Sequence, residues 1–436
     1  MSSAQVPEGY KQTEVGVIPE DWEINIIGDI ADVKTGPFGS VLHESDYVID
    51  GTPIITVEHL GDFGVEHFNL PMVSDEDKDR LKLFSLKVGD IVFSRVGSID
   101  RNALIGDSES GWLFSGRLLR VRLDSKINQP NYLSYHFHSK PFKQRVKAVA
   151  VGQTMPSLNT QILKGIQIVL PPLPEQKTIA QALSDVDALI TSLDKLVAKQ
   201  RQLKTAAMQQ LLTGKMRLPG FVKEKGYKHT EIGVIPDDWG LTSLEKISAF
   251  ITKGSTPTTY GFSWVQSGIL FLRSECVSEN GLDLSQSMFI SQKAHTVLSR
   301  SELHSGDILI TITGNVGRVV YLDNDFGVGN MNQHIARVRI VDNNVCAKFI
   351  YHFLTQSSVR KAFNTITTGQ AYPQISLKQV RDAVIPLPSF PEQCAIAAVL
   401  SDMDTAIAAL EIRRTKTQAI KQGMMQELLT GRTRLV

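Results

Sequence analysis

The sequence predicts an α/β protein: two pseudo-symmetric, mixed α/β domains joined by two long antiparallel helices that pair as a coiled coil. Two observations lead to this prediction. The 436-residue chain repeats itself with an offset of 217 residues, and each repeat closes with a helical pattern of roughly 40 residues, far beyond an average helix. We therefore expect a first domain over 1–171, a helix over 172–217, a second domain over 218–388 and a helix over 389–436.

The repeat opens with a lead-in segment over residues 9–22, which returns as 226–239. Its glycines and prolines predict an irregular segment rather than a helix. Trp22 and its counterpart Trp239 are the expected packing anchors. We assign no chemistry to this segment.

The remainder of each domain alternates short apolar runs with glycine-rich connections, which is typical of mixed α/β structure with short strands. A helix and a Gly-Gln loop then precede each long helix. The expected strands are 53–57, 91–93, 269–272 and 308–310, the helices lie near 132–147 and 349–363, and the loops are 152–157 and 369–374.

Each long helix carries an apolar stripe, because its apolar residues recur in steps of three and four. About 38 residues at about 1.5 Å each give a rod of roughly 57 Å, which needs a partner along its apolar side. The nearest partner is the other helix; the alternative is that each helix packs only on its own domain. We assign the stripe to partner binding: Ile179, Leu183, Val186, Ile190, Leu193, Ile396, Leu400, Met403, Ile407 and Leu410.

The composition is that of a soluble protein with a formal net charge of +1. Its apolar runs are too short for a membrane span, and its first residues lack the pattern of a signal peptide. Cys276, Cys346 and Cys394 form no C-x-x-C pair, which favours a reducing compartment without disulfides. We expect a cytoplasmic protein with no membrane contact.

Charge is unevenly distributed along the first domain. Residues 1–100 hold 7 Lys and Arg against 19 Asp and Glu, whereas residues 101–150 hold 9 against 3. Such segregation is typical of a positive face that binds a polyanion. A solvated basic helix would explain the same pattern.

No catalytic motif, metal site or cofactor site is apparent. There is no G-x-x-x-x-G-K-[ST] phosphate loop, and residues 128–131 do not match the loop of an amino-methyltransferase. Glu175-Gln176-Lys177 resembles the end of a nuclease motif, but its counterpart replaces the lysine with Cys394. His136 and His138 have metal-ligand spacing, but only His136 has a counterpart, His352, which favours a packed helical histidine. We expect no catalysis by this chain.

The loops keep their glycines between the two copies but change their polar residues. Arginine pairs with guanine, and asparagine or glutamine with adenine, so these residue types suit base reading. Loops that keep their glycines but differ in their polar residues indicate two copies of one fold that recognise different targets. The DNA-binding candidates are Arg95, Ser98, Arg101, Arg117, Gln153, Thr154, Asn315, Arg318, Gln333, His334, Gln370 and Tyr372.

These features resemble the DNA-specificity subunits of type I restriction-modification systems. The resemblance rests on the start of the long helix, Pro-Leu-Pro-Glu-Gln at 172–176 and Ser-Phe-Pro-Glu-Gln at 389–393, and on the Leu-Leu-Thr-Gly end. It implies two target-recognition domains that each read half of a bipartite site in double-stranded DNA, with the helices setting the gap. It also implies that two methyltransferase subunits dock on the helices to methylate adenine, and that restriction/translocase subunits add cleavage.

The second long helix departs from the family pattern in two ways. Ser389-Phe390 replaces Pro-Leu at the second helix, and Gly423 lies within that helix.

Two alternative functions remain. A scaffold that binds proteins instead of DNA would lack a steep salt dependence of binding. A self-sufficient methyltransferase would bind S-adenosylmethionine by itself.

Overall fold

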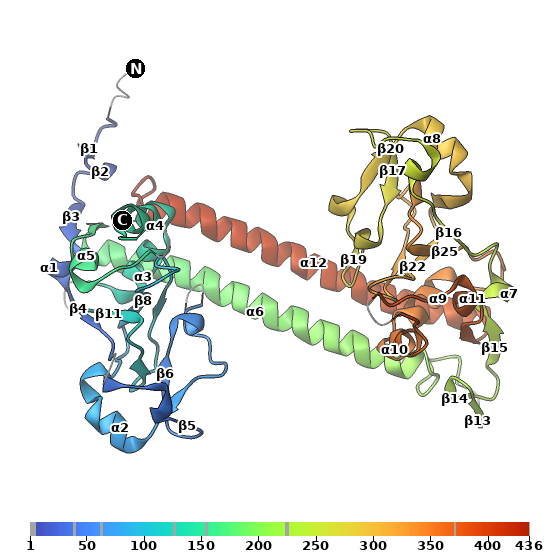
Figure 1. Ribbon diagram of the computed structural model, residues 1–436, viewed down its shortest axis with the longest axis horizontal. Helices are drawn as coiled ribbons and strands as arrows, with labels where there is room; N and C mark the ends of the chain where they lie inside the picture. Colours follow the sequence, from blue (N-terminus) through green and yellow to red (C-terminus); the bar gives the residue numbers. More distant parts are fainter. Residues whose placement is uncertain are drawn as a thin grey trace. The chain divides into compact units, whose positions relative to one another are not determined.

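The computed structural model describes residues 6–37, 41–61, 64–124, 128–152, 156–222, 226–369 and 372–435. The chain forms two compact units (Figure 1), each described by itself. The first unit comprises residues 1–194 together with 412–436, and the second comprises residues 195–411. The C-terminal end of the chain therefore belongs to the first unit, and each unit contains part of both long helices.

The first unit is built around an antiparallel sheet of four strands in the order β4-β11-β8-β9. Side chains alternate between its faces: Phe93 and Val121 pack toward helices α3 and α4, whereas Val92 and Leu118 pack toward a second sheet, ordered β10-β6-β7-β5. The bounds are β4 Ala31–Thr35, β5 Tyr47–Val48, β6 Thr52–Ile55, β7 Met72–Val73, α2 Asp75–Arg80, β8 Ile91–Ser94, β9 Asn102–Leu104, β10 Leu113–Phe114, β11 Leu118–Leu123, α3 Pro130–His138, α4 Lys140–Val149 and α5 Thr160–Lys164.

The lead-in of each copy forms a β-hairpin, so the prediction of an irregular segment was wrong. Gly16 and Gly233 follow the tight turns with φ of 117° and 111°, which favours glycine there. The next strand of each copy pairs with the strand just before the long helix. The bounds are β1 Tyr10–Thr13, β2 Gly16–Pro19, β3 Glu23–Ile26, α1 Ile27–Ile30 and β12 Gln167–Leu170, with counterparts β13 Tyr227–Thr230, β14 Gly233–Pro236, β15 Gly240–Ser243, α7 Leu244–Ile247 and β26 Val384–Leu387.

The second unit repeats the plan with the sheets β16-β25-β22-β23 and β20-β17-β24-β21. Ile308 and Ile310 face the helices, while Leu309 and Ile335 face the second sheet. The bounds are β16 Thr252–Lys253, β17 Ile269–Leu272, β18 Val277–Ser278, β19 Gly281–Leu282, β20 Met288–Ile290, α8 Gln292–Val297, β21 Glu302–His304, β22 Ile308–Thr311, β23 Val319–Tyr321, β24 Val328–Met331, β25 Ile335–Val338, α9 Ala347–Leu354, α10 Ser357–Thr365 and α11 Leu377–Arg381.

The helix expected near 132–147 is two helices, and so is its counterpart. Ser139 ends α3 in an extended conformation and accepts a hydrogen bond from the backbone N–H of Phe142, which caps α4. Pro141 then suits the first turn of α4 because that turn needs no N–H donor there. In the second unit, Thr355 and Gln356 separate α9 from α10, and the extended Gln356 precedes α10 without a side-chain cap.

The long helices are α6, Leu173–Leu211, and α12, Phe390–Leu428, each of 39 residues. Gly423 does not interrupt α12. In the first unit, Asp187 pairs with Lys421 and Asp194 with Arg414; in the second, Arg201 pairs with Glu411 at 2.6 Å and Lys204 with Asp404 at 2.5 Å. Positions rise along one helix as they fall along the other, which confirms the predicted antiparallel pair.

The ends of the apolar stripe enter the domain cores. Ile179 and Leu183 pack with Met425 and Leu428 in the first unit. Ile396 and Leu400 pack with Leu211 and Leu212 in the second. Each helix thus contacts both its partner helix and a domain. In the described part of the chain, no helix has the length and apolar character needed to cross a membrane.

Candidate nucleic-acid interface

In the second unit, several loops meet at one end of the antiparallel sheet. The end of β22 lies opposite the start of β25, with Thr311 paired with Ile335. Bridges from Gln374 to Thr313 and Thr368 bring the loop after α10 to the same end. We call this end the loop edge; in this unit it comprises 254–256, 312–318, 332–334, 368–369 and 372–374.

The predicted residues Gln333, His334 and Tyr372 lie together at this edge. The Gln333 amide contacts the His334 Nε2 at 3.1 Å, and the His334 and Tyr372 rings meet edge to face with centroids 6.4 Å apart. Tyr372 is 59% exposed and lies over Gly314. Asn315 is exposed on the neighbouring loop. The edge therefore presents amide, imidazole and phenol groups to solvent.

The loop edge of the first unit has the same backbone frame, over 35–37, 95–101, 115–117, 151–152 and 156–157. Ser157 bridges to Val96 and Val151, as Gln374 does in the second unit. Arg95 donates to Gly116 O and Thr35 Oγ1, both at 3.4 Å. Arg117 and Ser98 are exposed. This edge offers guanidinium groups where the other offers an amide and an imidazole.

Two predicted arginines contact the protein itself. Arg101 donates to the carbonyl oxygen of Leu60. Arg318 lies 3.7 Å from Glu279, and its backbone N–H donates to Thr311 Oγ1. Their guanidinium groups therefore brace the loops, and their role in DNA binding stays a prediction.

Gln153, Thr154 and Gln370 lie outside the described residues. Sequence reasoning missed Thr256, whose hydroxyl donates to Gln333 Oε1 at 2.5 Å, and Thr35, which contacts Arg95. Each threonine contacts a residue at least 60 positions away. The available signal was their place within three residues of a strand end and close to a glycine, Gly36 or Gly254.

The last part of the basic stretch of the first unit forms α4, which is followed closely in the chain by the loop-edge residues 151–152. Lys140 and Lys147 are exposed, and Lys147 pairs with Asp100 of the loop edge at 2.9 Å. Arg145 is half-buried over the Phe142 ring, and burial lowers its pKa. Part of the positive charge therefore lies beside the candidate site.

The Pro-Glu-Gln motif is structural. Glu175 accepts from Trp22 Nε1 at 3.0 Å and from Arg434 Nε at 2.7 Å, and the hydrogen bonds that Arg434 donates to Glu175 and Asp21 raise the pKa of Arg434. Gln176 accepts from the backbone N–H of Gln129. Glu392 is equally buried and pairs with Arg217. These carboxylates hold the start of each long helix and are closed to a substrate.

His136 is buried, and its ring nitrogens have no hydrogen-bond partner among the described residues. Burial lowers its pKa to about 3. The described part of the chain contains no cluster of three or more potential metal ligands. The counterpart of His352 is Tyr135, not His136 as predicted: Tyr135 contacts Ser184, and His352 contacts the matching Ser401.

Matching crevices lie between helix and domain in the two units. That of the first unit has a volume of about 410 Å³ and includes Tyr135 and Asp187. That of the second has about 850 Å³ and includes the corresponding His352 and Asp404. Its lining also includes the charged residues Lys204, Lys348 and Glu411.

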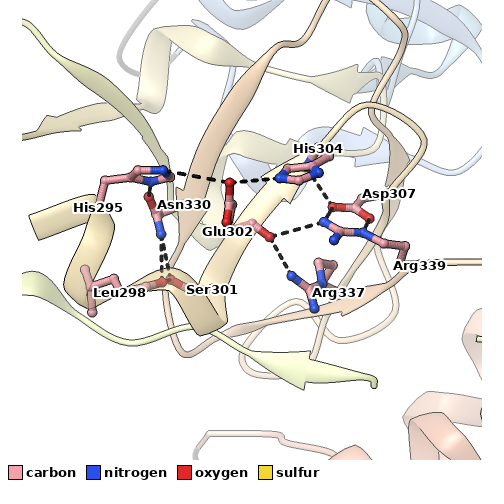
Figure 2. A network of polar contacts seen from close by, with 9 residues as sticks. All are labelled: His295, Leu298, Ser301, Glu302, His304, Asp307, Asn330, Arg337 and Arg339. Carbon is pink, nitrogen blue, oxygen red and sulfur yellow. Dashed lines mark hydrogen bonds and ion pairs between the residues drawn. The ribbon is translucent and has the colours of Figure 1, made fainter. Parts of the chain in front are cut away.

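In the second unit, a network of polar contacts braces the end of the sheet β16-β25-β22-β23 that lies opposite the loop edge (Figure 2). Arg339 holds Asp307 at 2.6 Å, and His304 contacts Glu302 at 2.9 Å and lowers the pKa of that carboxyl. The first unit has the matching pair Arg122 and Asp90 at 2.6 Å. This shared pair fixes the sheet end that faces away from the loop edge.

Comparisons with known proteins match the whole arrangement. The family described as "Type I restriction modification DNA specificity domain" matches residues 19–204 and 236–422. The chain is 29% identical over 435 residues to the MjaX protein of Methanocaldococcus jannaschii, provisionally named a type I restriction enzyme specificity subunit, covering 98% of this chain and 97% of that protein. The EcoBI specificity subunit of Escherichia coli is 24% identical over 342 residues, covering 76% and 70%.

Solved structures share the fold. The crystal structure of a type I restriction-modification S subunit from M. genitalium has a TM-score of 0.59 at 15% identity, covering 93% of this chain and 96% of that one. A structure from a study of complex assembly in the type I system has a TM-score of 0.54 at 15% identity, covering 95% and 99%. The duplicated architecture is thus a known one.

Proposed function

Because the chain belongs to the type I restriction-modification DNA specificity family, we propose that the loop edge of each unit reads one half of a bipartite target in double-stranded DNA. The chain is a specificity subunit, and the catalytic activities of such systems lie in other subunits.

The observation that carries this proposal is the difference between the two loop edges. They share strands, bridges and loop geometry, yet the first edge presents Arg95 and Arg117, whereas the second presents Gln333 and His334. Arginine favours guanine, whereas glutamine favours adenine. Two such edges on one chain suit two different half-sites.

An exchange of loops tests this assignment. Replacing residues 95–101 and 115–117 by their counterparts 312–318 and 332–334 should change the half-site read by the first unit and leave the other half-site unaltered. The measurement is selection from randomised DNA duplexes by the full chain. Recovery of the original pair of half-sites would contradict the proposal.

We also propose that the long helices set the spacing between the half-sites. Support comes from their length, because 39 residues at about 1.5 Å each measure roughly 58 Å, more than one turn of DNA at about 34 to 36 Å. Antiparallel ion pairs and buried ends stiffen this connection.

For its partners, we propose that the chain directs two methyltransferase subunits, and through them restriction/translocase subunits, in the cytoplasm. The two matching crevices support two copies of one partner, since corresponding positions line both. The stripe residues assigned to partner binding are buried or half-buried within this chain: Ile179, Leu183, Val186, Ile190, Leu193, Ile396, Leu400, Met403, Ile407 and Leu410. Leu196 and Leu203 of α6, by contrast, are 39% and 47% exposed.

Those two leucines are seven residues apart and so lie on one side of α6, as in a coiled-coil seam. Changing both to glutamate should reduce methyltransferase-subunit binding at least about tenfold, because charge is disfavoured in the core of an interface. Isothermal titration with the purified partner measures this effect. The matched control changes exposed Val297 and Val328 to glutamate; equal binding by both double variants would contradict the assignment.

A further inference from the structure

The side-chain amide of Gln333 is held from two sides. Thr256 Oγ1 donates to its oxygen at 2.5 Å, and its nitrogen donates to His334 Nε2 at 3.1 Å. The His334 backbone N–H is in turn fixed by Asn332 Oδ1 at 3.1 Å. A hydroxyl and an imidazole nitrogen can each donate or accept, so the two contacts fix the position and plane of the amide, whose oxygen faces Thr256 and whose nitrogen faces His334 in this structure.

Hydrogen-bond counting shows what the held amide still offers. A glutamine amide has two N–H donors and an oxygen with two lone pairs. Thr256 uses one lone pair and His334 uses one donor. One donor and one acceptor therefore remain on the half-buried Gln333 at the loop edge. That pair matches N7 and the N6 amino group of adenine in the major groove.

Among the described residues of the first loop edge, no glutamine is held in this way. The counterpart of Gln333 is Gly116, and the counterpart of His334 is the exposed Arg117. A guanidinium carries donors only, and its bidentate partner among the bases is guanine. At these two positions, the described part of the chain thus has a fixed amide only in the second unit.

We propose that Thr256 is a positioning residue that fixes the Gln333 amide to read adenine, so that the half-site of the second unit contains an A·T pair at the contacted position. This inference rests on the proposed function, because it requires the loop edge to meet DNA. Gln333 makes the contact, and Thr256 acts through Gln333. Without the hydroxyl, the amide loses one of its two contacts and can rotate out of the plane in which it presents its donor and acceptor.

Selection from randomised duplexes by the full chain tests the inference. The natural chain should select adenine at one position of one half-site. Thr256→Val should reduce that preference by about tenfold, within the range of one bidentate contact. Thr256→Ser, which keeps the hydroxyl, should retain it. Thr258→Val is the matched control, because Thr258 is an exposed threonine two residues away.

A double-variant cycle separates positioning from a general structural effect. If Thr256 acts through Gln333, Thr256→Val should add little to the loss caused by Gln333→Ala. Additive losses, or a Thr256→Val chain that keeps the full adenine preference, would overturn the inference. Failure of the natural chain to select any sequence would instead count against the proposed function itself. Thermal unfolding of each variant identifies losses due to misfolding, and the Thr256→Ser result then decides.

Discussion

At the residue scale, the same cluster fastens the start of each long helix. Arg434 joins Glu175 and Asp21 in the first unit, and Arg217 joins Glu392 and Asp238 in the second. A buried carboxylate needs such a partner because an uncompensated charge in the interior is costly. The repeated Pro-Glu-Gln motif therefore reflects anchoring of the helix.

Arg217→Ala should destabilise the second unit by about 3 kcal/mol, the low end for a broken buried pair, since Arg217 keeps some solvent contact. The measurement is urea unfolding followed by tryptophan fluorescence. Arg432→Ala is the control, because Arg432 pairs with Glu427 at 3.5 Å on the surface and should change stability by only about 0 to 1 kcal/mol. Similar losses in both variants would contradict the burial argument.

His136 should make the first unit sensitive to acid. Its folded-state pKa of about 3 lies below the usual value of 6.5, so the unfolded chain binds the proton first as pH falls. The stability it contributes is complete above about pH 6.5 and declines toward pH 3. Between pH 6.5 and 5 the loss is about 2 kcal/mol for one such group.

His136→Phe should remove that loss, and the second unit has Phe353 at the corresponding position. Unfolding in urea at pH 7 and pH 5 measures the difference. His229→Phe, at an exposed histidine, should leave the pH dependence unchanged. An unaltered acid response in His136→Phe would show that other groups dominate.

At the element scale, periodic patterns in the sequence predicted the long helices, whereas shorter elements were harder to predict. The 217-residue repeat and the spacing of apolar residues by three and four were sufficient to predict the helix pair, because the buried face of a long helix appears as a periodic pattern in its own sequence. The lead-in hairpins and the break at Ser139 were missed, since turn and cap chemistry over a few residues decided them. Tyr135 was missed as the counterpart of His352 because Tyr-His-Phe occurs in both helices with a shift of one residue.

The candidate site was predictable only in part. Arg117, Asn315 and Tyr372 are exposed at the loop edges, as base-reading residues need to be. Arg101 and Arg318 have the right residue type, but contacts with Leu60 and Glu279 occupy them. Sequence shows which groups could bind a base, whereas the acceptor that a side chain meets depends on distant segments.

Shortening both helices should alter the spacer and preserve the half-sites. Deleting residues 199–202 and the facing 406–409 removes about one turn, roughly 5.4 Å from each rod, or between one and two base pairs at about 3.4 Å each. Sequencing of methylated bases in cells that also express the partner subunits measures the result. A changed half-site with an unchanged spacer would refute the role of the helices in spacing.

At the scale of the whole molecule, the two units are completed differently along the chain. The second unit is one continuous segment, whereas the first needs residues 412–436. Tyr10 donates to the carbonyl of Gly431 at 2.8 Å, and a Cβ at Gly431 would lie 2.6 Å from Pro19 Cδ. With its φ of 71°, Gly431 is a position that only glycine fills without strain.

Deleting residues 431–436 should therefore loosen the first unit alone. The deletion removes Arg434 and leaves Glu175 and Asp21 without their cation. Hydrogen exchange should rise around β3 and the start of α6, while the second unit, with its own Arg217, keeps its protection. Equal exchange in the truncated and full chains would contradict this expectation.

The place of Arg434 also has a consequence for synthesis. The ribosome makes the first domain early, but the contacts of residues 412–436 with that domain can form only after this segment emerges, because it belongs to the same unit. All residues of the second unit are therefore synthesised before those of the first unit are complete. A product terminated before Arg434 lacks the cation that pairs with Glu175 in the first unit. Translation of residues 412–436 is therefore the step that completes the first unit.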